Sequence, residues 1–177
     1  LVVVIVSQTV SASAFPVAAH DFTVDFWYKA APDMHEDRDR LFFASPGALI
    51  QTYRDGTAAD RLYVNLAMGG PEVTLNMTGI EEHLHNNTWH HFSVVKAANT
   101  TCFAYIDGKM MSSTTTNVNS TMDTPTTVGI GGDGTYHSGG YLDEIRISTS
   151  TFDKPQIKWT HTQTAGAGNK NAYDVHG

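Results

Sequence analysis

The sequence predicts an all-β fold, a jelly-roll sandwich of two antiparallel sheets, and three observations support it. Several short runs alternate apolar and polar residues, so that one face of each run is apolar. Asp-Gly dipeptides, which favour tight turns, occur at positions 55–56, 107–108 and 133–134. The 177 residues are enough for one domain with its own core. Many short strands separated by such turn signals are typical of a sandwich or jelly roll.

The amino-terminal run Leu1–Val6 is apolar and rich in β-branched residues. We predict a strand that is buried on both faces. A signal-peptide apolar region is the alternative, because Ser11–Ala14 resembles an Ala-x-Ala cleavage site, but no basic stretch precedes the run. The run is also far shorter than the roughly 20 residues that span a bilayer.

The central strands are predicted from alternation. In the run Phe22–Lys29, aromatic and aliphatic residues occupy every second position, and the positions between them carry Thr23, Asp25 and Trp27. The runs 62–66 and 73–77 alternate in the same way. Each of these runs is expected to present one apolar face to the core.

The carboxyl-terminal part is predicted to contain one short helical turn, Asp153–Trp159. Asp153 is a suitable capping residue, and Pro155 stands where a first-turn proline is tolerated. Residues 160–177 lack periodicity and are predicted to form an extended tail. We therefore expect a sandwich domain over residues 1–159 and a tail over residues 160–177.

Composition excludes several classes of protein. Hydrophobic residues make up 41% of the chain and charged residues 16%, which argues against both disorder and membrane insertion. The net charge is -7, and the basic residues are scattered, so nucleic acid is not an expected partner. The single cysteine, Cys102, falls in an alternating run and is expected to be a buried, small apolar residue rather than a catalytic thiol.

Four motifs occur in a characteristic order: Asp21–Tyr28, Thr88–Val95, Phe103–Lys109 and Gly140–Ser148. Together they resemble the laminin G-like modules of the concanavalin A-like lectin/glucanase superfamily, in the form frequent in bacterial and phage surface proteins. The resemblance extends roughly from Ser11 to Trp159. It implies a concanavalin A-like jelly roll located outside the cell, on a cell surface or on a virion.

No catalytic residues are predicted. The β-glucanases of the superfamily carry Glu-x-Asp-x-Glu on one strand, which points all three carboxylates into one cleft, and this string is absent here. The nearest carboxylate cluster, Glu36–Asp39, lacks apolar alternation and is predicted to be a solvated loop. No Gly-x-Ser-x-Gly nucleophile motif occurs either. The chain is expected not to be an enzyme.

Calcium is the cofactor that the resemblance implies, as a structural ion near the rim of the sandwich. Asp143 matches the calcium-binding aspartate of the β-glucanases by its position in the last long strand, and Asp21 is a weaker candidate for a second ligand. A carboxylate with several carbonyl oxygens suits this hard cation. The alternative is that Asp143 only accepts hydrogen bonds at a strand edge.

The histidines allow a second metal hypothesis. His83 and His85 would lie on one face of an extended segment, a half-site for zinc or copper that Glu81 or Glu82 would complete. The alternative is a solvated loop. His90 and His91 are expected to pack and to form hydrogen bonds rather than to bind metal.

A sugar site requires exposed aromatic rings beside fixed polar groups. The glycine-rich loop 131–140 supplies Tyr136 and His137 together with Asp133, and Tyr53 is the second choice. Two functions remain open. One is a module for adhesion or carbohydrate binding, with or without calcium. The other is a structural or decorating subunit of a virus particle or an extracellular filament, whose partners would be neighbouring subunits in a larger assembly.

Overall fold

The computed structural model describes residues 6–8, 21–30, 38–45, 48–53, 61–66, 73–80, 83, 86–97, 101–116, 127–132 and 139–148. Within these ranges, no helix is long and apolar enough to cross a bilayer. The predicted helical turn Asp153–Trp159 and the predicted tail 160–177 both lie outside the described residues.

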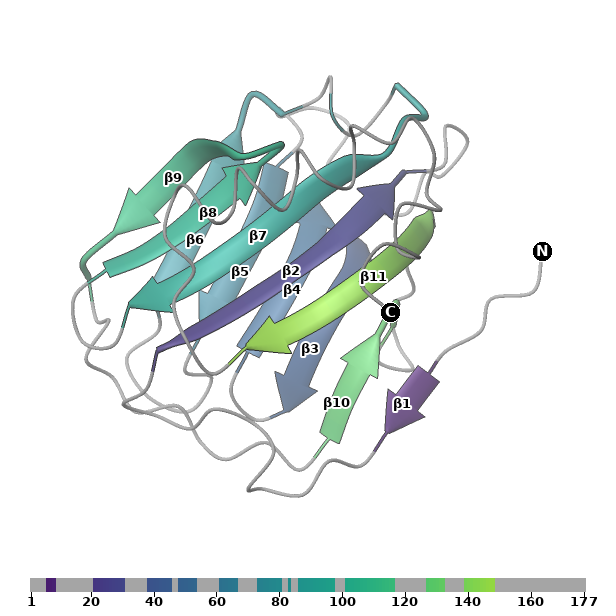
Figure 1. Ribbon diagram of the computed structural model, residues 1–177, viewed down its shortest axis with the longest axis horizontal. Helices are drawn as coiled ribbons and strands as arrows, with labels where there is room; N and C mark the ends of the chain where they lie inside the picture. The colour runs from purple at the N-terminus through teal and green to yellow at the C-terminus, as the bar shows by residue number, and fades with distance from the viewer. Residues whose placement is uncertain are drawn as a thin grey trace, which may run out of the picture.

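Two antiparallel sheets lie one behind the other (Figure 1). The six-stranded sheet has the order β1 (Val6–Gln8), β10 (Thr127–Ile130), β3 (Arg38–Ser45), β4 (Ala48–Tyr53), β5 (Arg61–Leu66) and β6 (Val73–Thr78). The five-stranded sheet has the order β11 (Tyr141–Ser148), β2 (Phe22–Lys29), β7 (His90–Ala97), β8 (Thr101–Ile106) and β9 (Lys109–Thr114). The predicted all-β sandwich is confirmed.

The core lies between the sheets and follows the alternation in the sequence. The apolar positions of β2 that point inward are almost completely buried: Phe22, Val24, Phe26 and Tyr28. The inward positions of β5 and β6 face them: Leu62, Val64, Leu75 and Met77. Each such side chain stabilises the fold by about 1.5–3 kcal/mol relative to an exposed one. Cys102 is fully buried in the same cluster, as expected.

The outward face of β2 is buried as well. Thr23 and Asp25 are at most 1% exposed, and Trp27 is 9% exposed. A carboxylate buried in this way is costly unless charged or polar partners compensate it. Asp25 has two such partners, His91 on β7 and Arg146 on β11.

One strand boundary differs from the prediction, and another cannot be compared with it. The amino-terminal strand was expected over Leu1–Val6, of which residues 1–5 lie outside the described residues; β1, Val6–Gln8, pairs with β10 at the edge of its sheet. The segment Glu36–Asp39 was predicted to be a loop. This prediction was wrong for its second half, because β3 begins at Arg38, and the backbone of Arg38 pairs with that of Tyr53. Backbone hydrogen bonds formed with β4 make a strand here without any apolar alternation.

Candidate functional site

Several strand ends meet at one end of the five-stranded sheet, which we call the rim (Figure 1). There β2 ends at Lys29, β7 begins at His90 and β11 begins at Tyr141. The β8–β9 hairpin turns at the same end, through Asp107 and Gly108. The antiparallel pairing of these strands therefore places segments that are far apart in the sequence side by side.

The hairpin turn fixes the Asp107 carboxylate. Asp107 and Gly108 have φ angles of 52° and 72°, the left-handed pair that a two-residue type I′ turn requires. The Asp107 amide donates to the His91 carbonyl at 2.8 Å. In return, the His91 amide donates to Asp107 Oδ1 at 2.9 Å, so Oδ1 is oriented by the neighbouring strand.

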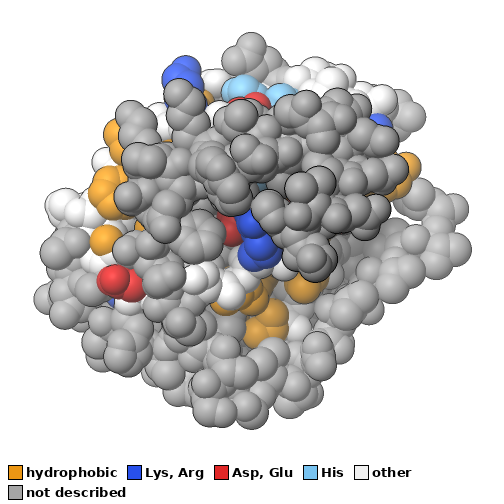
Figure 2. All heavy atoms as spheres, viewed as in Figure 1, with side chains coloured by type: hydrophobic (Ala, Val, Ile, Leu, Met, Phe, Trp, Pro, Cys, Tyr) orange, Lys and Arg blue, Asp and Glu red, His pale blue; other side chains and the backbone are white. Residues whose placement is uncertain are grey.

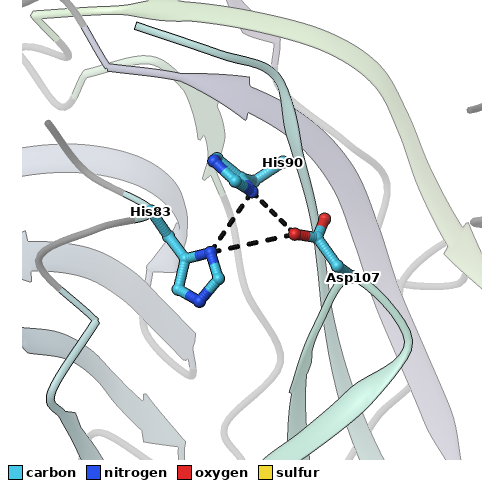
Figure 3. A group of neighbouring side chains, drawn as sticks. All are labelled: His83, His90 and Asp107. Carbon is cyan, nitrogen blue, oxygen red and sulfur yellow. Dashed lines mark hydrogen bonds and ion pairs between the residues drawn. The ribbon is translucent and has the colours of Figure 1, made fainter. Parts of the chain in front are cut away.

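Asp107 Oδ2 meets two imidazoles (Figure 3). It lies 2.7 Å from His90 Nδ1 and 3.8 Å from His83 Nδ1, and the two Nδ1 atoms are 3.3 Å apart. The three ligand atoms lie within 4.8 Å of one another, and no other group of at least three His, Cys, Asp or Glu ligand atoms that could hold a metal occurs among the described residues. We call these three residues the histidine cluster.

The second ring nitrogen of His90 is also held. Its Nε2 lies 2.9 Å from Thr88 Oγ1 and 2.8 Å from the Asn86 amide nitrogen. The Thr88 hydroxyl donates to Asn86 Oδ1 at 2.6 Å, and this hydrogen bond orients both side chains. The His90 ring is therefore fixed on both sides, and His90 and His91 both form hydrogen bonds as expected.

An aromatic surface adjoins the histidine cluster. The Tyr141 side chain is 54% exposed, the Lys29 ammonium nitrogen lies 5.6 Å from the centre of its ring, and the Trp89 ring lies 6.5 Å from it. Trp89 immediately precedes His90, so the two features share one rim. In the space-filling view, histidine and acidic atoms lie together at the top of the molecule (Figure 2).

Next to this surface, β11 contains a bulge between Asp143 and Arg146. Glu144 lies in the bulge with a φ of 53°, which is unusual for a residue other than glycine. Desolvation, reinforced by the neighbouring Asp143, raises the pKa of the Glu144 carboxyl to about 7. This carboxyl therefore takes up a proton at a higher pH than an ordinary glutamate does.

The two predicted calcium ligands lie apart. Asp143 is paired with Trp27, whereas Asp21 precedes the other end of β2. The six-residue separation along the strand corresponds to about 20 Å, so the two carboxylates do not share one ion. Calcium binding at Asp143 stays a prediction.

The other predicted site residues are not among those whose side chains the structure describes. Asp133, Tyr136 and His137 lie outside the described residues, as do Glu81, Glu82 and His85. Tyr53 ends β4, and its side chain is likewise not described. Tyr141 was missed as a ligand-binding candidate, although alternation along Gly140–Ser148 would have placed it on the outward face with Asp143.

A family model described as the concanavalin A-like lectin/glucanases superfamily matches residues 6–158. No curated protein matches the chain. Among solved structures, the binding domain of Paraclostridial Mosquitocidal Protein 1 is similar, with 15% identity and a TM-score of 0.70, over 89% of this chain and 40% of that one.

Two binding domains of botulinum neurotoxins are also similar. The type DC domain, solved in complex with rat synaptotagmin II, has 14% identity and a TM-score of 0.66 over 89% of this chain and 39% of its own. The type C structure, whose description ties cell entry to two ganglioside molecules, has 13% identity and a TM-score of 0.68 with the same coverage. At these identities the likeness shows the fold, and the chain spans about two fifths of those proteins.

Proposed function

The chain belongs to the concanavalin A-like lectin/glucanase superfamily, and from this premise we propose that it is a non-enzymatic extracellular binding module whose ligand is a glycan. The similar binding domains support a binding role, because one is described with two ganglioside molecules and another in complex with rat synaptotagmin II. The observation that carries it is the exposed Tyr141 ring at the rim.

The aromatic surface has the chemistry that a sugar requires. The C–H face of a pyranose stacks on an exposed aromatic ring, while hydroxyl or carboxylate groups need fixed polar partners. Tyr141 offers the ring, and Lys29 offers a cationic donor 5.6 Å from the ring centre. Trp89, half-buried beside Tyr141, extends the apolar surface. An ammonium group in this position favours an acidic sugar over a neutral one.

A glycan array with the purified chain tests the proposal. The wild-type protein is expected to bind a defined set of glycans, and Tyr141→Ala is expected to lose that binding at least tenfold. Ile147→Ala is the matched control, because Ile147 is also exposed (38%) but lies near the other end of β11. A repeat with a calcium chelator separates calcium-dependent from calcium-independent binding.

Binding that Tyr141→Ala leaves intact would contradict the site. No binding by folded wild-type protein would contradict the glycan ligand itself. The chain would then be better explained as a subunit that contacts protein neighbours in an assembly.

A further inference from the structure

We propose that His83, His90 and Asp107 form a binding site for a divalent transition metal of the zinc class, with one coordination position open to solvent. This inference does not depend on glycan binding. It rests on the histidine cluster, which joins His83 from the segment before β7, the first residue of β7 and the turn of the β8–β9 hairpin (Figure 3).

The spacing of the ligand atoms fits a tetrahedral metal. With metal–ligand bonds of about 2.0–2.1 Å, neighbouring ligand atoms of a tetrahedron lie about 3.3 Å apart. The cluster has separations of 2.7, 3.3 and 3.8 Å, which scatter around that value. An ion above this triangle of two nitrogens and one oxygen would keep a fourth position for water or a donor atom of a ligand.

The chemistry of the donor set favours zinc-class metals over calcium. Imidazole nitrogens are preferred ligands of Zn²⁺, Cu²⁺ and Ni²⁺, whereas Ca²⁺ and Mg²⁺ require a shell of oxygens. Two imidazoles with one carboxylate form a set found in zinc sites that keep an open position.

Neighbouring backbone and side-chain groups form hydrogen bonds with the proposed ligands Asp107 and His90. Asp107 Oδ1 accepts from the His91 amide, which leaves Oδ2 to face the histidines. The Asn86 amide nitrogen lies 2.8 Å from His90 Nε2 and, as a donor, favours the tautomer with the proton on Nδ1. Metal binding selects the other tautomer, in which His90 Nε2–H donates to the Thr88 oxygen at 2.9 Å, because the Thr88 hydrogen is already donated to Asn86. That tautomer leaves the lone pair of His90 Nδ1 pointing at the centre of the cluster. Partners of this kind orient metal-binding histidines in proteins generally.

The cluster is sheltered but accessible. The side chains of His83, His90 and Asp107 are 19%, 11% and 28% exposed. Partial burial lowers the local dielectric and strengthens binding, while the remaining exposure allows an ion to enter. The competing explanation is a purely hydrogen-bonded cluster, in which His90 Nδ1–H donates to Asp107 and no ion is held.

Zinc titration of the chelator-treated chain, followed by calorimetry, distinguishes the two. The wild-type protein is expected to bind Zn²⁺ at one high-affinity site, and Asp107→Asn is expected to weaken binding at least about 10- to 100-fold. Asparagine tolerates the left-handed turn and keeps an Oδ1 that can accept from the His91 amide, so this variant removes the ligand oxygen without removing the fold. His83→Ala is the second ligand variant.

Co²⁺ gives an independent spectroscopic readout, because tetrahedral Co²⁺ absorbs visible light much more strongly than six-coordinate Co²⁺. The tetrahedral band is expected in the wild-type chain and absent from both ligand variants. Tyr141→Ala is expected to bind Zn²⁺ normally, which separates this site from the proposed glycan site. Wild-type zinc affinity in both ligand variants, or no saturable zinc binding by the folded wild-type chain, would overturn the proposal.

Discussion

Arg146 donates two hydrogen bonds, from Nε at 3.0 Å and from Nη2, to one oxygen of the buried Asp25 carboxylate. The same oxygen lies 3.1 Å from His91 Nε2. The Asp25 side chain is 2% exposed, whereas that of Arg146 is 43% exposed. The guanidinium therefore reaches from the edge strand β11 over the sheet and neutralises a charge on its outward face.

Removal of Arg146 is expected to leave the Asp25 charge insufficiently compensated. We predict that Arg146→Met lowers the free energy of unfolding by about 1–3 kcal/mol, less than the loss typical of a fully buried pair because the guanidinium is partly solvated. Urea denaturation measures this change. The control Lys109→Ala, at an exposed position of β9, is expected to change stability by no more than about 0.5 kcal/mol.

The Asp25→Asn, Arg146→Met double variant completes a thermodynamic cycle. If the two side chains interact, the double variant loses less free energy of unfolding than the two single variants lose together, because the second substitution no longer leaves a buried charge without its partner. Additive losses would show that Arg146 stabilises the protein only through packing.

Glu144 predicts a pH-dependent stability. Desolvation raises the pKa of its carboxyl from 4.5 to about 7, so the folded state binds the proton more tightly than the unfolded state does. Between these two values the unfolded state carries fewer protons, and stability falls as the pH rises; above pH 7 the penalty is complete. Glu144→Gln is therefore expected to gain stability relative to the wild type as the pH increases from 4.5 to 7.

Thermal unfolding of both proteins from pH 4 to 8 measures this difference. The stability difference between Glu144→Gln and the wild type should be smallest near pH 4 and level off above pH 7. A difference that stays constant over this range would show that the carboxyl titrates normally.

Gly140 is predicted to tolerate no side chain. A Cβ there would collide with the Lys29 carbonyl oxygen and lie 2.7 Å from the Tyr28 ring and 3.0 Å from the Ala30 Cα. Because two of these three contacts are with backbone atoms, we expect Gly140→Ala to cost about 1–3 kcal/mol. Gly79→Ala is a useful comparison, since its Cβ would meet nothing within 4 Å and only the positive φ of 71° opposes it, at about 1–2 kcal/mol.

The fold was predictable because alternation is a local signal. The face of β2 that carries Phe22, Val24, Phe26 and Tyr28 is the face that the structure buries. The opposite face of β2 was not predicted to be buried, because alternation does not indicate what covers the outward side of a sheet. Backbone pairing explains why the strand at Arg38 was not predicted. Hydrogen bonds with β4 hold this segment in a strand although its sequence has no apolar alternation.

The histidine cluster was only half predictable. Local spacing suggested His83 with His85, whereas the structure joins His83 to His90 and Asp107. Asp107 lies beside His90 because of strand register: Phe92 pairs with Ile106, which sets the following turn opposite His91. The Asp-Gly turn was recognised in the sequence, and combining it with the β7–β8 register would have indicated that Asp107 joins the cluster.

Cys102 is predicted to be unreactive in the folded protein. Burial raises the pKa of its thiol to about 12, although the nearby Lys96 opposes the shift. Since the thiolate is the nucleophile, its fraction at pH 8 is about a thousandfold lower than that of an ordinary cysteine, and burial also blocks access. A thiol reagent at pH 8 should therefore label the chain rapidly only after urea denaturation. Cys102→Ala should show no labelling in either state, and rapid labelling of the native wild-type chain would mean that β8 opens readily at this position.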